Sequence, residues 1–132
     1  MFFEKKIMNL PLKAPFMMMQ LWRNQQLEPQ ELKKLQEKKL RAMVKHSYEN
    51  VAYYHERFRR ANLKPDDVRT MEDLAKIPIL TKKTLKSLPT EKIVARNIDL
   101  NSCTMHPTSG TSGTPLIVYW DKTAQLELYL RS

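Results

Sequence analysis

Both glycines of this 132-residue chain lie in one short segment, and that segment is where chemistry is expected. It reads TSGTSGTP and runs from Thr108 to Pro115. Its hydroxyl groups and successive backbone N–H groups are donors that can converge on a phosphate. Gly110 and Gly113 suit a backbone that folds closely around an anion, because glycine has no Cβ and tolerates positive φ. The segment predicts a phosphate-binding loop, and a plain hairpin turn rich in turn-forming residues is the alternative.

The loop matches neither of two familiar glycine motifs. A Walker A loop has a lysine directly after its second glycine, whereas Thr114 follows Gly113 here. A dinucleotide-binding fingerprint needs a third glycine, and the chain has none. Any phosphate binding would therefore rest on the donors of the loop itself, which belong to Thr108, Ser109, Gly110, Thr111, Ser112, Gly113 and Thr114.

Few other residues are candidates for chemistry. His46, His55 and His106 are too scattered to predict a metal site, but His106 lies two residues before the loop and is a candidate for lining a substrate pocket. The single cysteine, Cys103, excludes an internal disulfide and a clustered-cysteine metal site, and this usage is typical of a reducing cytoplasm. We assign no catalytic residue and no metal ligand.

The elements next to the loop are expected to be strands. Short runs of β-branched and aromatic residues occupy 103–106 and 116–120, on either side of the loop. They predict two adjacent strands of one sheet. Asp121 can then cap a last helix that begins at Lys122.

Helices are expected before the strands. Apolar residues recur at helical spacing after Pro29, and a second helix is predicted from Tyr53 to Ala61, closed by Asn62 in a left-handed conformation. Residues 65–89 predict two short helices, with a capping box formed by Thr70 and Asp73 and an N-cap at Thr81.

This order of elements predicts an α/β architecture, or α+β within the residues present, in which helices precede the first strands of a larger sheet. Residues 1–28 are interpreted as a poorly patterned lead-in with one apolar patch, and residues 29–132 as a partial N-terminal domain. The edge of the incomplete sheet is expected to be exposed, which favours self-association or a partner chain.

The chain is strongly basic, with 23 lysines and arginines against 14 acidic residues and a net charge of +9. The charges alternate with apolar residues at helical spacing, as on solvated helix faces. A basic module that binds RNA, DNA or an acidic lipid surface through residues 30–45 is an alternative. No apolar run is long enough to predict a transmembrane segment.

Two parts of the sequence resemble a known family. TSGTSGTP resembles the Ser/Thr/Gly-rich phosphate loop of the AMP-forming acyl- and aryl-coenzyme A synthetases, the adenylate-forming ligase superfamily. HSYENVAYYHERFRRANLKPDDVRTMEDLAKIPILTKKTL is similar to the region before that loop in phenylacetate–coenzyme A ligases and related capsular-polysaccharide biosynthesis proteins. The resemblance covers about residues 29–130.

The resemblance implies a function for the loop. In that family the loop holds the β- and γ-phosphates of ATP while a carboxylate attacks the α-phosphate, which gives an acyl-adenylate and pyrophosphate. A thiol, usually that of coenzyme A, then displaces AMP. By this match residues 108–114 bind ATP, with Thr111, Ser112 and the backbone of Gly110 and Gly113 as the main contacts. ATP, Mg²⁺ and coenzyme A are the implied cofactors, and a carboxylic acid is the implied substrate.

The sequence also departs from the family. A lysine often present within or just after the loop is replaced by Thr114 and Leu116, so charge neutralisation would rest on N–H groups, Mg²⁺ or other residues. The family's adenine-binding, ribose-binding and Mg²⁺-binding motifs and its C-terminal lysine have no counterpart here. We therefore expect a truncated ligase fragment that does not form an adenylate alone. A non-catalytic interaction or regulatory fragment is the alternative.

Overall fold

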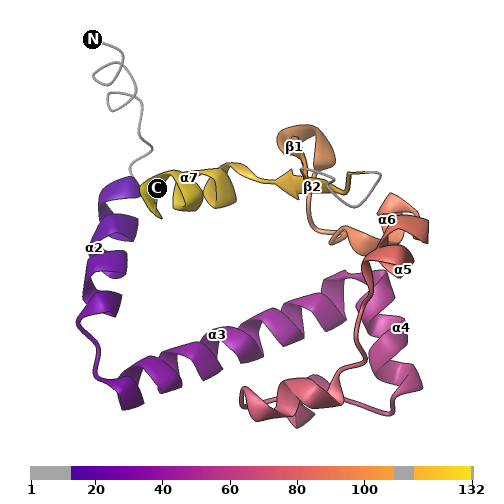
Figure 1. Ribbon diagram of the computed structural model, residues 1–132, viewed down its shortest axis with the longest axis horizontal. Helices are drawn as coiled ribbons and strands as arrows, with labels where there is room; N and C mark the ends of the chain where they lie inside the picture. The colour runs from indigo at the N-terminus through magenta and orange to yellow at the C-terminus, as the bar shows by residue number, and fades with distance from the viewer. Residues whose placement is uncertain (1–12, 109–114, 132) are drawn as a thin grey trace. The chain divides into compact units, whose positions relative to one another are not determined.

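The computed structural model describes residues 13–108 and 115–131 (Figure 1). Its helices and strands follow one another as α2 (Ala14–Gln25), α3 (Pro29–Asn50), α4 (Ala52–Arg60), η1 (Pro65–Asp67), η2 (Glu72–Lys76), α5 (Lys82–Ser87), α6 (Thr90–Ile93), η3 (Leu100–Ser102), β1 (Thr104–Pro107), β2 (Ile117–Trp120) and α7 (Lys122–Arg131). The fold is α+β, as predicted, with many helices and one two-stranded antiparallel sheet.

The chain divides into two compact units. Pro29–Asp99 forms the helical unit, while the described residues before Pro29 and after Asp99 form the hairpin unit, which contains the sheet. Residues 29–132 were interpreted from the sequence as one partial domain, and that assignment stays a prediction.

The core of the helical unit lies where α3 meets α4. Val44, Phe58 and Val68 are buried together there. The rings of Tyr48 and Phe58 meet edge to face with their centroids 5.7 Å apart. Partly buried side chains complete the cluster, and these are Leu40, Tyr48, Leu63 and Ile77. The apolar positions that predicted the helix after Pro29 therefore include the ones that build the core.

The turn after α4 confirms the prediction for Asn62. This residue has a φ of 51°, in the left-handed region. Its N–H donates to the carbonyl of Arg59 (3.1 Å), and the N–H of Leu63 donates to the carbonyl of Phe58 (2.9 Å). These two bonds form a Schellman motif, which brings Leu63 back onto the core.

The segment after this turn is only partly as predicted. Short helices form, but η1 and η2 are 3₁₀ helices, followed by α5 and α6. The Thr81 cap is confirmed, because its hydroxyl accepts from the N–H of Thr84 at 3.1 Å. The Thr70 and Asp73 capping box is half right. Asp73 accepts from the N–H of Thr70 (3.0 Å) and from the Thr70 hydroxyl, but the N–H of Asp73 donates to the carbonyl of Thr70 (3.2 Å) and not to its hydroxyl.

Asp73 carries a pH-dependent part of the stability. Lys76, 2.7 Å away, and the N–H groups of Arg69 and Thr70 hold the pKa of Asp73 well below its ordinary value of 3.8. A carboxyl whose pKa is lower in the folded chain than in the unfolded chain stabilises the fold at pH values above the ordinary pKa of 3.8. This stabilisation is lost as the pH falls from 3.8 through the lower folded-state pKa. We expect Asp73→Asn to remove this dependence and to lower the urea midpoint at pH 7.

The measurement is urea unfolding of the native and D73N chains from pH 2 to pH 6. Asp66→Asn is the matched control, since Asp66 is exposed and lies in η1. Acid slopes that are equal in the native and D73N chains would contradict this role for Asp73.

The last part of the helical unit is fixed to the corner between α3 and α4. Lys92 of α6 pairs with Glu56 of α4, and this pairing is the main reason that the pKa of Glu56 lies below its usual value. The N–H of Arg96 donates to the carbonyl of Asn50 at the end of α3 (2.9 Å). These contacts between residues far apart in sequence hold α6 and the segment after it against α3 and α4.

Helix α2 of the hairpin unit forms within the residues that were interpreted as a poorly patterned lead-in, where no helix was predicted. Pro15 lies in its first turn, a position that proline suits. Phe16 and Trp22 remain more than half exposed. The helix contacts α7 of the same unit.

Candidate functional site

The predicted strand pair forms an antiparallel hairpin around the glycine loop. In its register Thr104 lies opposite Trp120, Met105 opposite Tyr119, His106 opposite Val118 and Pro107 opposite Ile117. Both strands are four residues long. The sequence prediction placed these adjacent strands to within one residue, and the structure adds their antiparallel direction and register.

Two hydrogen bonds close the loop at its base. The N–H of Thr108 donates to the carbonyl of Leu116 (2.9 Å), and the N–H of Leu116 donates to the Thr108 Oγ1 (3.0 Å). The two residues, which we call the neck, therefore hold the ends of the loop together. Of the seven predicted phosphate-binding residues, Thr108 is described by the structure. The other six, Ser109, Gly110, Thr111, Ser112, Gly113 and Thr114, lie outside the described residues.

His106 lies in β1, two residues before Thr108 of the neck. Alternate residues of a strand share a face, so the Thr104 and His106 side chains are on one side of β1. The His106 ring packs on that of Trp120 across the strands, with centroids 4.9 Å apart. His106 remains exposed.

Helix α7 anchors the far end of the hairpin. The Asp121 carboxylate accepts from the N–H of Ala124 at 2.7 Å, which confirms the predicted N-cap. The Gln125 amide donates to the carbonyl of Trp120 (3.3 Å) and to the hydroxyl of Thr104. One side chain of α7 therefore contacts both strands and fixes their separation at the end opposite the loop.

The other two histidines have structural contacts. The His55 Nδ1 lies 3.1 Å from the carbonyl of Tyr48 and its ring stacks on that of Tyr48. His46 interacts with Asn50 one helical turn later. Within 13–108 and 115–131, no three His, Cys, Asp or Glu side chains are grouped as metal ligands. Nor is any helix in those ranges long and apolar enough to cross a membrane.

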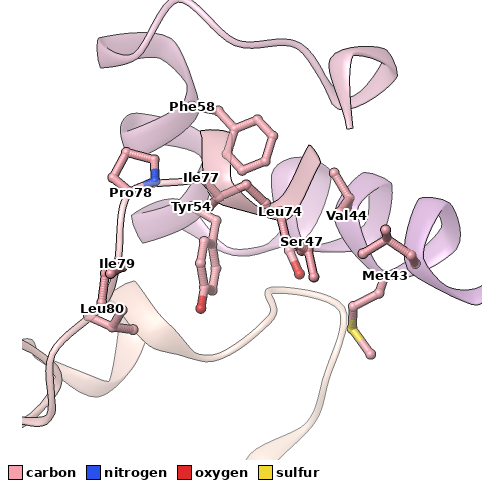
Figure 2. Close-up of a pocket in the computed structure, with 11 residues that line it drawn as sticks. Met43, Val44, Ser47, Tyr54, Phe58, Leu74, Ile77, Pro78, Ile79 and Leu80 are labelled. Carbon is pink, nitrogen blue, oxygen red and sulfur yellow. The ribbon is translucent and has the colours of Figure 1, made fainter. Parts of the chain in front are cut away.

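Sequence reasoning did not predict a pocket in the helical unit. It has a volume of about 410 Å³. Figure 2 shows the hydroxyls of Ser47 and Tyr54 among side chains that are otherwise mostly apolar. The lining residues come from α3, α4, η2 and the segment after η2, and they are Leu40, Met43, Val44, Ser47, Tyr54, Phe58, Leu74, Ile77, Pro78, Ile79 and Leu80. Such a site combines segments too distant in sequence for a motif to reveal.

Comparison with known proteins points to one group. The chain is 36% identical over 96 residues to the phenylacetate–coenzyme A ligase of Escherichia coli, and 38% identical over 96 residues to that of Aromatoleum evansii. Each match covers 67% of this chain. The ligase of Thermus thermophilus is 35% identical over 105 residues, or 73% of the chain. This chain is a sequence relative of the phenylacetate–coenzyme A ligases.

The relationship is partial. The ligase-like chain spans about 20% of the length of the curated relatives that it matches. No protein-family model matches it. The resemblance that was predicted from the loop and from the segment before it is therefore confirmed, as similarity to one part of these ligases.

Proposed function

We propose that this chain carries the ATP-phosphate-binding part of an AMP-forming carboxylate–coenzyme A ligase. The similarity to phenylacetate–coenzyme A ligases carries the proposal. It is supported by the hairpin, which closes a segment containing both glycines at a neck of two hydrogen bonds. A loop with closed ends needs less ordering when it binds a ligand than an open one.

In the proposed reaction the loop binds and orients ATP. Its N–H groups and hydroxyls hold the β- and γ-phosphates, so that a carboxylate oxygen of the substrate attacks the α-phosphate and pyrophosphate leaves. The coenzyme A thiol then displaces AMP and forms the thioester. Mg²⁺ would accompany the phosphates, where it commonly keeps few protein ligands. This chain's loop contributes positioning and electrostatic stabilisation.

His106 is proposed to line the acyl substrate pocket. It is exposed, lies two residues before Thr108 and packs on Trp120. These observations support the proposal that the acyl substrate binds beside this imidazole. No described residue is assigned as a catalytic acid, base or nucleophile, so we expect ATP binding without turnover from the 132-residue chain.

The test is calorimetric titration of the 132-residue chain with MgATP, pyrophosphate and adenosine. We expect ATP and pyrophosphate to compete, with dissociation constants of about 1 μM to 1 mM, a range typical of enzyme substrates. Adenosine should not compete, because the loop contacts phosphates. Absence of ATP and pyrophosphate binding at millimolar concentration would contradict the proposal.

The same preparation tests two associated expectations. Carboxylate-dependent exchange of pyrophosphate into ATP should be absent, and its appearance would contradict the expected inactivity.

Within the described residues the sheet has two strands, so each has an outer edge that pairs with no other strand. Self-association through such an edge stays a prediction, and light scattering over a range of concentrations measures it.

A further inference from the structure

The pocket of the helical unit opens onto an apolar surface. Its eleven lining residues are all uncharged. Three of them are exposed apolar side chains: Ile79 is 85% exposed, Met43 65% and Leu74 38%. A small molecule inside the pocket would leave most of Ile79 in water, whereas a protein segment laid over the pocket would cover it. Exposed apolar side chains that gather around a hollow are typical of protein–protein contacts.

The part of α3 that lines the pocket is about two helical turns long. It begins at Leu40 and ends at Ser47. Seven steps of 1.5 Å separate these residues along the helix axis by about 10.5 Å. The i and i+7 positions of a second helix are equally far apart, so a helix lying along α3 can present side chains at i, i+3 or i+4, and i+7 to the pocket. Ile79 and Leu80 lie across the pocket from Met43 (Figure 2) and would contact the opposite side of that helix.

The pocket lies in a basic part of the chain. The helical unit contains 17 lysines and arginines against 10 aspartates and glutamates. Lys39 is exposed and precedes Met43 by one helical turn, which places both residues on one face of α3. Helix α5 begins two residues after Leu80 and contains three lysines and no acidic residue. Lysines therefore adjoin both the α3 part of the lining and the part that ends at Leu80.

Two acidic residues directly before the lining residue Leu74 already have basic partners. They are Glu72 and Asp73 of η2. The Glu72 carboxylate lies 3.8 Å from the Lys33 ammonium, and the Asp73 carboxylate lies 2.7 Å from that of Lys76. These pairs offset the acidic charge locally, so a partner would meet an apolar surface with basic surroundings.

We propose that this pocket is a docking site for an amphipathic helix of a partner protein. The apolar side chains of that helix enter the pocket and cover Ile79 and Met43, while acidic side chains at its edges lie near Lys39 and α5. This arrangement matches apolar with apolar surface and places opposite charges at the rim. A second copy of this chain fits less well, because its helical unit is also basic and like charges across an interface oppose binding. The inference concerns the helical unit alone and is independent of ATP binding.

The experiment titrates the full chain with three fluorescently labelled synthetic peptides of about 15 residues, because shorter helices are marginal in water. The first peptide has leucine at i, i+4 and i+7, glutamate on the opposite face and alanine elsewhere. The second has lysine in place of each glutamate, and the third has alanine in place of each leucine. We expect the first peptide to bind at least about tenfold more tightly than either control, as measured by fluorescence anisotropy.

Two variants locate the binding surface. Ile79→Asp places a charge in the proposed site, whereas Met71→Asp places the same charge on an exposed apolar residue of the helical unit that does not line the pocket. We expect I79D to bind the first peptide more than about tenfold more weakly, and M71D to remain within about threefold of the native chain. Both replaced side chains are exposed, so circular dichroism should show the native helix content in both variants.

The inference fails if the first peptide shows no binding up to about 1 mM, the limit of a very weak complex. Equal affinities for the first and third peptides would show that charge alone attracts the peptide, and equal affinities for the first and second would exclude an acidic partner. Equal losses in I79D and M71D would place the contact outside the pocket. Light scattering adds a further outcome: a native dimer that I79D converts to a monomer would make a second copy the occupant and overturn the proposal.

Discussion

Replacing Phe58 with alanine is expected to destabilise the helical unit by about 3–5 kcal/mol, the usual cost of deleting a buried phenyl ring. Phe58 is 1% exposed and packs with Val44 and Val68. Its ring also meets Tyr48 edge to face. The whole stability of a domain is about 5–15 kcal/mol, so F58A should remove a large fraction of it and lower the urea midpoint of the unit.

Urea unfolding followed by circular dichroism measures this loss. Phe16→Ala is the matched control, because Phe16 lies on α2 and is 57% exposed. That variant should change the free energy of unfolding by less than about 0.5 kcal/mol. Equal effects of F58A and F16A would show that the core does not lie between α3 and α4.

Replacing both loop glycines with valine should weaken MgATP binding by more than about tenfold. The reason is steric and conformational. A β-branched residue blocks a close approach of the backbone to phosphate and strongly disfavours positive φ. Gly110 and Gly113 are the only residues of the chain without a Cβ, so no other position supplies this freedom.

A graded series makes this prediction sharper. G110A/G113A adds one methyl at each site and should give an intermediate affinity, while T104V at the far end of the hairpin serves as the control for general damage to the strands. Leu116 amide exchange should stay slow in the glycine variants, because the neck does not involve either glycine. Native-like affinity in G110V/G113V would mean that the loop is an ordinary turn.

Much of the fold was predictable because its signals are local. The apolar spacing after Pro29 predicted α3, and the left-handed Asn62 follows from the need to end α4. Thr81 and Asp121 both cap as predicted, since each bonds an N–H three residues ahead. In all these cases the deciding interaction lies within about one helical turn.

The sequence-based predictions were incomplete where the local sequence pattern is weak or is compatible with two structures. The residues before Pro29 were interpreted as poorly patterned and no helix was predicted there, although α2 forms. At Thr70 the sequence pattern allowed a capping box, but the hydroxyl donates to Asp73. A hydroxyl can donate or accept, and only the positions of the surrounding atoms decide which.

Local sequence signals were enough to predict the helix after Pro29, the two strand positions, the glycine-containing loop and the resemblance to a ligase family. Tertiary structure alone decided that Thr108 bonds Leu116, eight residues away, through its side chain. It also decided that residues from three segments between Leu40 and Leu80 line one pocket. The physical reason is distance along the chain. Backbone preferences act over a few residues, whereas the neck and the pocket depend on where packing brings separate segments together.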